Sequence, residues 1–256
     1  MTIQLRQICL VAQKLEPVIE ELCNVLGLER CYVDPAVAAF GLENTLLPVG
    51  RNFLEVVAPI RDGTAGGRYL ERRGGDGGYM VITQADTKPN QLAVRQRATD
   101  LGVRVAYERS AEDWSLIQLH PGDMRAAFLE IEWDRSGDVA GNWMPAGGGG
   151  WEDKVRQDVT LDFVGVELQG PDPVALGEHW AGVLGMPLDR EGDDLSIQLN
   201  NARLRFVEAT DGRGPGLGGL DIAVTDRKHV LTRAKARGAY VSDDQVNLSG
   251  TRFYLR

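Results

Sequence analysis

The sequence of 256 residues lacks the features that direct a protein to membranes or nucleic acids. It has no apolar run long enough to span a bilayer. Its N-terminus has no basic segment followed by an apolar core, so we expect neither a membrane anchor nor a signal peptide. Lys and Arg together number 28 against 37 Asp and Glu, which leaves a formal charge of −9. Because the sequence also lacks a basic stripe, nucleic acids and anionic membrane surfaces are not expected as partners.

Cysteine is also scarce. The three residues Cys9, Cys23 and Cys31 are odd in number and lie in predicted strands and helices. A small chain held together by disulfides usually has an even number of cysteines. We therefore expect buried thiols in a reducing compartment, and we predict a cytoplasmic protein.

One short pattern occurs twice. FLEVV at residues 53–57 returns as FLEIE at residues 128–132. In each copy a glutamate, Glu55 or Glu130, lies within a run of strand-forming apolar residues, on the same strand face as the Phe two residues before it. Burying a carboxylate without a partner is costly. The repeat therefore indicates either a water-filled concavity or a bound cation.

Four copies of one β-α-β-β-β unit account for most of the chain. Each predicted helix follows a strand and ends at a glycine that precedes an apolar residue. The helices are predicted at 16–27, 90–102, 173–185 and 227–238. The strands are predicted at 5–13, 31–34, 37–42, 53–57, 79–84, 104–108, 115–119, 127–132, 161–168, 196–199, 203–208 and 220–224, with the last ones toward Tyr254. Because this ending occurs at the same place in all four units, it indicates an internal repeat.

A glycine-rich segment divides these repeats into two pairs. Residues 147–150 are four consecutive glycines, which do not hold regular structure, so 134–158 is predicted to be a linker. We therefore expect an N-terminal domain at 1–133 and a C-terminal domain at 159–256. Trp143 and Trp151 flank the glycines, and they either pin the linker to a domain surface or form a lid over a pocket.

This tandem arrangement resembles the vicinal oxygen chelate superfamily, which includes glyoxalase I, methylmalonyl-CoA epimerase, bleomycin-resistance proteins and extradiol dioxygenases. The resemblance rests on LRQICLVAQ (5–13), FLEVVAP (53–59), GGYMVITQAD (77–86) and HPGDMRAAFLEIE (120–132), and it extends over essentially the whole chain. It implies an α+β fold in which four tandem βαβββ units form two cupped mixed β-sheet domains with helices outside. Within the superfamily, the chain resembles glyoxalase-like members that have two domains.

The resemblance also implies where a metal would bind. In the superfamily the first and last strands of two paired units supply the ligands, and the matching positions here are Gln7, Glu55, Tyr79 and Glu130. Tyr79 stands where the family usually has His, and a neutral phenol with a pKa of about 10 is a poor ligand. The remaining set of Gln7, Glu55 and Glu130 offers oxygen donors, which would suit Mg²⁺ or Mn²⁺, or no metal at all. No organic cofactor is expected.

The same positions predict a lyase or isomerase that abstracts a proton next to a carbonyl of a small molecule, in the N-terminal cup. Glu55 or Glu130 would act as the base, a cation would stabilise the enediolate, and Tyr79 would donate a hydrogen bond to the developing oxyanion. The arginines at 68, 72 and 73 suit a carboxylate or phosphate of the substrate, or could instead form buried ion pairs with the glutamates. The predicted substrate contacts are Arg68, Arg72, Arg73 and Trp114.

The second domain lacks this set of polar residues. Phe163, Arg205 and Leu220 stand at the matching positions, and no acid matches Glu130, so any metal is predicted to lie within residues 1–133. The absence of two matching histidines argues against an extradiol dioxygenase.

A second class of function stays open, a non-catalytic protein of the bleomycin-resistance type that sequesters a drug or metabolite. The two inward acids favour the enzyme and the missing His favours the binding protein. The sequence also leaves a homodimer possible.

Overall fold

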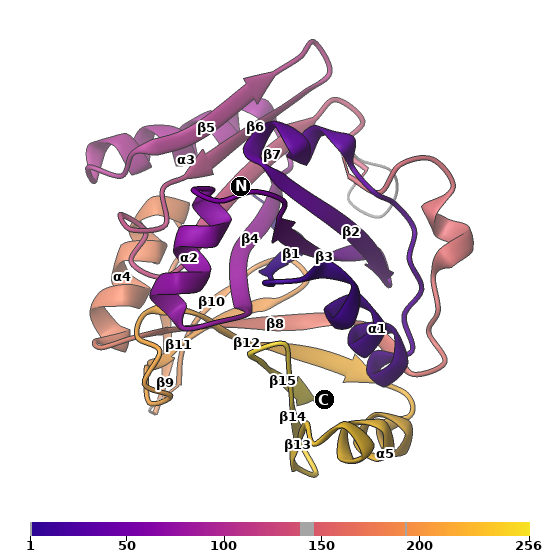
Figure 1. Ribbon diagram of the computed structural model, residues 1–256. Coiled ribbons are helices and arrows are strands. Elements are labelled where there is room, and N and C mark those ends of the chain that lie inside the picture. Colours follow the sequence, from indigo (N-terminus) through magenta and orange to yellow (C-terminus); the bar gives the residue numbers. More distant parts are fainter. Residues whose placement is uncertain (1, 139–145, 193) are drawn as a thin grey trace. The chain divides into compact units, whose positions relative to one another are not determined.

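The computed structural model describes residues 2–138, 146–192 and 194–256 of the chain. They form two mixed β-sheets with helices outside, which confirms the expected α+β class (Figure 1). Within the described residues, no helix is both long and apolar enough to cross a bilayer. Cys9, Cys23 and Cys31 are free thiols, and burial raises the pKa of Cys31 to about 12.

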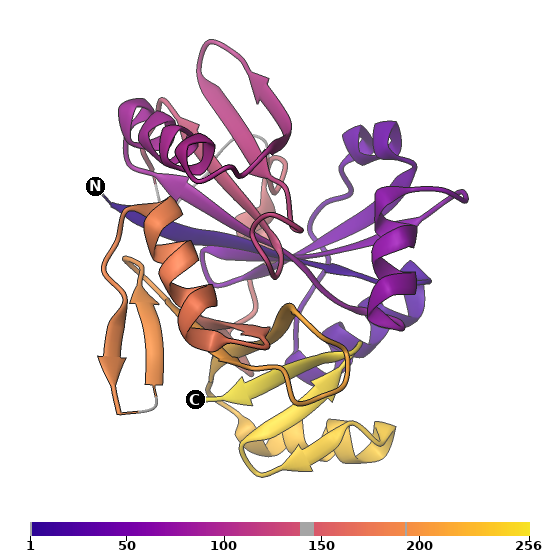
Figure 2. The same ribbon diagram turned by 90° about the vertical axis from the view of Figure 1, so that its left-hand side faces the viewer.

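The first sheet is built from the strands that precede residue 135, in the order β2-β3-β1-β4-β7-β6-β5. Strands β4 and β7 run parallel, whereas β2–β3, β5–β6 and β6–β7 are antiparallel pairs. The bounds are β1 Ile3–Val11, β2 Leu42–Val49, β3 Asn52–Pro59, β4 Gly77–Ala85, β5 Val105–Ser110, β6 Trp114–Leu119 and β7 Phe128–Asp134. The β5–β6 hairpin is drawn in magenta in Figure 2.

The second sheet is built from the strands that follow residue 159, in the order β13-β14-β15-β12-β8-β11-β10-β9. Here β8–β11 and β12–β15 are the parallel pairs. The bounds are β8 Thr160–Gly170, β9 Asp189–Glu191, β10 Asp194–Gln198, β11 Arg203–Glu208, β12 Gly216–Val224, β13 Tyr240–Ser242, β14 Gln245–Leu248 and β15 Thr251–Leu255. The predicted domain division at residues 133 and 159 stays a prediction.

The chain forms two compact units that each combine repeats from both halves of the sequence. Unit 1 consists of residues 1–7, 79–144 and 165–217, and holds the second and third repeats. Unit 2 consists of residues 8–78, 145–164 and 218–256, and holds the first and fourth repeats. The helices of unit 1 are α3 Lys88–Asp100 and α4 Pro173–Leu184, and those of unit 2 are α1 Leu15–Leu26, α2 Ala65–Arg73 and α5 Arg227–Arg237.

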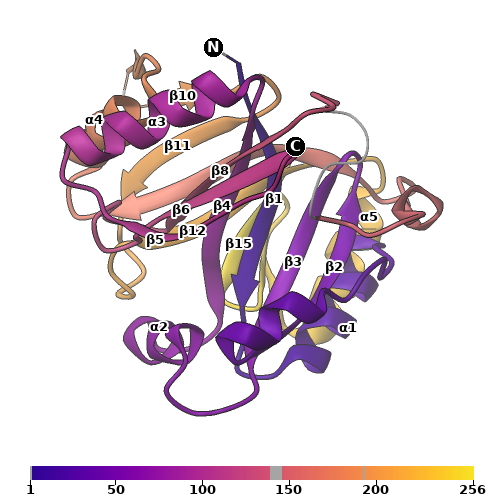
Figure 3. The same cartoon turned by 90° about the horizontal axis from the view of Figure 1, so that it is seen from above.

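In unit 1, α3 and α4 lie side by side (Figure 3). Arg97 of α3 donates to the carbonyls of Val183 and Leu184, at 3.0 and 2.7 Å, and so satisfies two carbonyls at the end of α4. Fully buried Trp180 of α4 donates its indole N–H to the carbonyl of Met124 at 2.9 Å, which fastens α4 to the turn between β6 and β7.

The four helices predicted from the sequence are confirmed to within two residues at each end. The glycine expected at each C-terminus has a left-handed backbone, with φ between 67° and 73° at Gly27, Gly102, Gly185 and Gly238. This conformation strains any residue with a Cβ, so the sequence marked these ends correctly.

Two predictions in the first repeat are wrong. The strand expected at 37–42 is a 3₁₀ helix, Pro35–Phe40, because the Asp34 side chain accepts from the amide of Ala36 and Pro35 suits the first turn. The strand at 31–34 is only an isolated bridge from Tyr32 to Leu46. The strand that follows, β2, was missed because it contains Pro48, which an edge strand tolerates.

The Gly- and Arg-rich segment at 63–78, for which the sequence predicted no helix, contains α2. Thr64 caps this helix by accepting from the amide of Gly67 at 2.9 Å. Two glycines near its start hid it from sequence reasoning. Gly66 lies close to β2, since a Cβ there would be 3.1 Å from Cδ2 of Leu42.

The glycine-rich linker is held against unit 2. Trp151 begins a short 3₁₀ helix, Trp151–Lys154, and packs edge-on against Phe53 with ring centroids 5.0 Å apart. Trp151 therefore pins this segment to the first copy of the FLE pattern. Trp143 lies outside the described residues.

Candidate functional site

Strand β7 carries three buried acids on one face of unit 1. Glu130, Glu132 and Asp134 alternate along the strand and therefore share a face. In the neighbouring strands, Gln118 of β6 pairs with Glu130 and Gln84 of β4 pairs with Glu132. Paired residues of adjacent strands share a face, so these five polar side chains form one cluster, which we call the acid cluster.

The opposite face of β7 is covered by α3. Gln91 of α3 is buried and donates to the carbonyls of Ser115 and Ile131, both at 2.9 Å, while the Ser115 hydroxyl donates back to Gln91 at 2.7 Å. These bonds fix α3 on the face of Ser115 and Ile131. The acid cluster therefore faces away from α3.

Amide side chains hold two of the acids. Gln118 Nε2 donates to Glu130 Oε2 at 2.6 Å, and Gln84 Nε2 donates to Asp134 Oδ2 at 2.9 Å. The other oxygen of Asp134 accepts from the Ser136 hydroxyl and from the amide of Gly137. Asp134 is therefore a fixed acceptor that sets the orientation of Gln84.

Glu130 and Glu132 are joined to each other by a hydrogen bond between their carboxyl groups. Burial raises the pKa of Glu130, and the hydrogen bonds from Glu132 and Gln118 oppose this rise. Burial raises the pKa of Glu132 much further, and the adjacent charge of Glu130 adds to it, while Arg6 opposes it. The pKa of Glu132 is therefore raised further than that of Glu130.

The first copy of the pattern places Glu55 in unit 2. Glu55 lies on β3, where Asn44 Nδ2 of β2 donates to its Oε1 at 2.5 Å. Asn44 is itself held by the amide of Asp34, which donates to its Oδ1 at 2.9 Å. Glu55 therefore lies in a different unit from Glu130, with an amide partner of its own.

The other residues predicted for the site are divided in the same way. Gln7 and Tyr79 belong to unit 1 with Glu130, and the Tyr79 ring packs edge-on against Phe128 at 5.0 Å, two residues before Glu130. Trp114 pairs with Asp134 and so lies at the end of the acid cluster, with the Arg109 guanidinium 5.3 Å from its ring.

The three predicted arginines lie on α2 of unit 2. Arg68 donates to the carbonyl of Gly63 at 2.7 Å, Arg72 lies over the Tyr69 ring at 5.0 Å, and Arg73 is buried. The contacts of Arg68 and Arg72 both lie within unit 2. Their predicted role in binding a substrate anion stays a prediction.

Sequence reasoning missed five members of this region: Gln84, Gln118, Glu132, Asp134 and the buried Arg6 of β1. The alternation of acids in EIEWD was the available signal for Glu132. The amides give no such signal, because their positions matter only once the strands are paired. Arg6 donates to the carbonyl of Asp138 at 3.2 Å. It also lies near enough to Glu132 for its positive charge to oppose the rise in the pKa of that carboxyl group.

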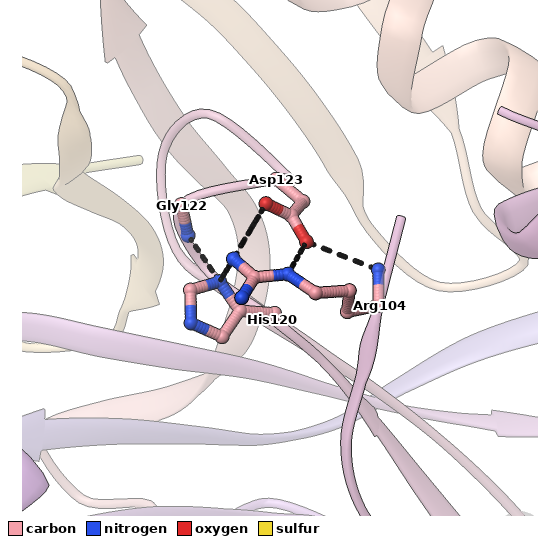
Figure 4. A network of polar contacts seen from close by, with 4 residues as sticks. All are labelled: Arg104, His120, Gly122 and Asp123. Atoms are coloured by element: carbon pink, nitrogen blue, oxygen red, sulfur yellow. Dashed lines mark hydrogen bonds and ion pairs between the residues drawn. The ribbon is translucent and has the colours of Figure 1, made fainter. Parts of the chain in front are cut away.

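A salt-bridged turn fixes the start of β7 (Figure 4). The Arg104 guanidinium donates to both oxygens of Asp123, at 2.7 and 2.9 Å, and the Arg104 amide donates to the same carboxylate at 3.0 Å. These bonds lower the pKa of Asp123 to about 2. His120 accepts from the amide of Gly122 through Nδ1 at 3.2 Å, so the turn is closed from within.

Unit 1 by itself does not fit a divalent cation. Of the predicted ligands it holds only Gln7 and Glu130, and Glu130 is already bonded to Gln118 and Glu132. Across the described residues, no group of three or more His, Cys, Asp or Glu side chains is placed to hold a metal ion. The set of Gln7, Glu55 and Glu130 therefore stays a prediction.

A family model described as "Glyoxalase-like domain" matches residues 8–184. The chain belongs to this glyoxalase-like family. None of the curated proteins matches the sequence. The family assignment confirms the resemblance to the vicinal oxygen chelate superfamily, and the polar cluster on β7 lies within the matched residues.

Solved structures agree with this glyoxalase-like fold. An Mn(II)-bound glyoxalase from Novosphingobium aromaticivorans has 14% identity and a TM-score of 0.65, with 98% of this chain and 81% of that chain covered. A hypothetical protein from Staphylococcus aureus has 13% identity and a TM-score of 0.64 over 100% and 99% of the two chains. A variant of 4-hydroxymandelate synthase from Streptomyces coelicolor has 18% identity and a TM-score of 0.64 over 92% and 75%. At these identities the likeness shows the fold alone.

Proposed function

We propose that this glyoxalase-like protein is a lyase or isomerase that abstracts a proton next to a carbonyl of a small molecule, with Glu130 as the base. The observation that carries the proposal is the buried pair of Glu130 and Glu132, which are 4% and 2% exposed. Two acids within hydrogen-bond reach are a costly arrangement in a protein interior, and such arrangements are concentrated at functional sites.

The chemistry follows from the two carboxyl groups. Glu130 takes the proton from the substrate carbon, and the electrons of the broken C–H bond form the enolate. Glu132, hydrogen-bonded to Glu130, is proposed as the acid that returns a proton to the substrate when Glu130 has taken one. Gln118 keeps Glu130 in position through its bond to Oε2. Tyr79 lies at an odd spacing from Ile82 and Gln84 on β4, the residues that share the face of the acid cluster, so its role as donor to the enolate oxygen stays a prediction.

Proton exchange with solvent tests this role without knowledge of the natural substrate. A panel of 2-oxo compounds, thiohemiacetals and acyl-CoA esters is incubated with the protein in D₂O, and deuterium on the carbon next to the carbonyl is measured by mass spectrometry. We expect exchange by the wild type and a loss of about 10²-fold or more in Glu130→Gln, the usual effect of removing a general base. Glu108→Gln, at an exposed position of the same unit, is the matched control.

Two results would count against the proposal. Exchange that is unchanged in Glu130→Gln would remove Glu130 as the base, and Glu55→Gln would then be the next variant to measure. Exchange that disappears after treatment with EDTA and returns with Mn²⁺ or Mg²⁺ would contradict the metal-free form of the mechanism and support the set Gln7, Glu55 and Glu130. Tight ligand binding without exchange by any compound would favour the sequestering protein instead.

A further inference from the structure

Two buried oxygen atoms of the acid cluster have no hydrogen-bond donor. They are Gln84 Oε1 on β4 and Glu132 Oε2 on β7, and neither has a partner within the described part of the chain. Gln84 and Glu132 are directly paired across the two parallel strands, so the two side chains leave the same face side by side. They are 1% and 2% exposed, which leaves little water to satisfy them.

The orientation of the Gln84 amide is fixed by its neighbour. Its Nε2 donates to Asp134 Oδ2 at 2.9 Å. Asp134 accepts from Ser136 and Gly137 with its other oxygen, which holds it in the position of an acceptor. A rotated Gln84 would place its carbonyl oxygen against this carboxylate, so Oε1 must point away from Asp134 and remain an acceptor.

The surroundings of these atoms contain mainly acceptors. Glu130 lies two residues before Glu132 and Asp134 two residues after it on the same face. Arg6 is the nearby cation, and its Nη1 is directed to the carbonyl of Asp138. A ligand that brings acceptors or negative charge would meet repulsion from this row of acids, whereas a ligand that brings donors would satisfy the two oxygens.

We propose that Gln84 Oε1 and Glu132 Oε2 bind a hydrogen-bond-donating group of the ligand, a hydroxyl or an ammonium, beside the base Glu130. This inference rests on the proposed function, since it names the substrate class of the same site. The substrate is then a small carbonyl compound that carries a hydroxyl or amino group next to the carbonyl, and not a 2-oxo acid recognised through its carboxylate.

Four small ketones separate these possibilities. Dihydroxyacetone and aminoacetone carry donors, the dimethyl ether of dihydroxyacetone has the same oxygens without donors, and pyruvate has a carboxylate. Binding is measured by chemical-shift titration of ¹⁵N-labelled protein. We expect dihydroxyacetone or aminoacetone to bind at least tenfold more tightly than the ether and pyruvate. Equal binding of the ether and its parent, or no binding of either donor ketone at millimolar concentration, would overturn the proposal.

Two variants locate the binding to the paired oxygens. Gln84→Met and Glu132→Met each remove one acceptor while keeping a side chain of similar length. We expect each variant to weaken the donor ketones about tenfold and to leave the ether unchanged. Gln96→Met, on the exposed part of α3, is the matched control. Donor ketones that bind equally to wild type and both variants would also overturn the proposal.

The same variants distinguish the donor site from the proton chemistry. Glu132→Gln, which keeps a carbonyl oxygen, should weaken both donor ketones less than Glu132→Met does. Glu130→Gln should abolish exchange while reducing binding much less. If binding follows the expected order but no exchange occurs, the donor site stands and the proposed reaction fails.

Discussion

The two copies of the FLE pattern surround the same glutamate with different neighbours. In β3, Glu55 accepts from Asn44, and the next residue on its face is Val57. In β7, Glu130 accepts from Gln118, and the next residue on its face is Glu132. Both copies therefore supply an amide from the adjacent antiparallel strand, but only the second adds an acid. In the second copy, the adjacent charge of Glu130 adds to the rise that burial causes in the pKa of Glu132.

A fourth buried glutamate shows the arrangement that favours stability. Glu167 of β8 pairs in register with Arg205 of β11, and their side chains meet at 2.9 Å. This acid is balanced by a cation on the neighbouring strand. The three arrangements (acid with amide, acid with acid, and acid with guanidinium) can therefore be compared by substitution.

The largest effect is expected from Arg205→Met. Without the guanidinium, Glu167 loses its counter-charge in a site where its side chain is only 5% exposed. We expect the free energy of unfolding to fall by about 3 kcal/mol, measured by urea denaturation. A further change of Glu167→Gln should restore most of the loss. Arg203→Met, two residues earlier on the same strand and more exposed, is the control and should change stability by less than about 0.5 kcal/mol.

The second largest loss of stability is expected at Gly147, which packs against Phe53 of the first FLE copy. A Cβ at Gly147 would lie 2.5 Å from Cζ of Phe53, and the Gly147 backbone has φ +86°. Gly147→Ala is therefore expected to lower the free energy of unfolding by about 2 kcal/mol through strain and displacement of the segment that begins at Trp151. Gly149→Ala has no atom near its Cβ and should be close to neutral. Equal effects of the two variants in thermal unfolding would show that the segment does not press on Phe53.

The sequence predicted the repeats well because they depend on local signals. Each helix end was marked by a glycine, and the β7 pattern was visible as alternating acids. The acid cluster could not be predicted in full, because Gln84 and Gln118 join it only through strand pairing. Arg6 was missed because it lies on β1 and comes near Glu132 of β7 only in the folded sheet. The 3₁₀ helix in place of the strand at 37–42 was missed because an Asp-Pro cap outweighed the apolar run that follows it.

A smaller effect, of opposite sign, is expected from Glu132→Gln. Glutamine can donate to Glu130 without a proton from solvent, and it removes an acid whose ionisation burial opposes. We expect the free energy of unfolding at pH 7 to rise by about 1 kcal/mol, while binding of the donor ketones weakens. Such a gain in stability with a loss of binding would identify Glu132 as a residue kept for function. A variant that is less stable than wild type would instead assign Glu132 a structural role.

The smallest effect is expected from the pair of Asp123 and Arg104, an acid with a guanidinium at the surface. The pKa of Asp123 is lowered to about 2 in the folded protein, compared with about 3.9 in an unfolded chain. Its contribution is therefore complete above pH 4 and is lost as the pH falls toward 2. Asp123→Asn should lower the free energy of unfolding at pH 7 by less than about 1 kcal/mol, and the difference from wild type should vanish near pH 2. Asp113→Asn, in a more exposed pair with Arg135, is the control. A difference that persists at pH 2 would show that Asp123 supports the turn through its hydrogen bonds to the backbone and not through its charge.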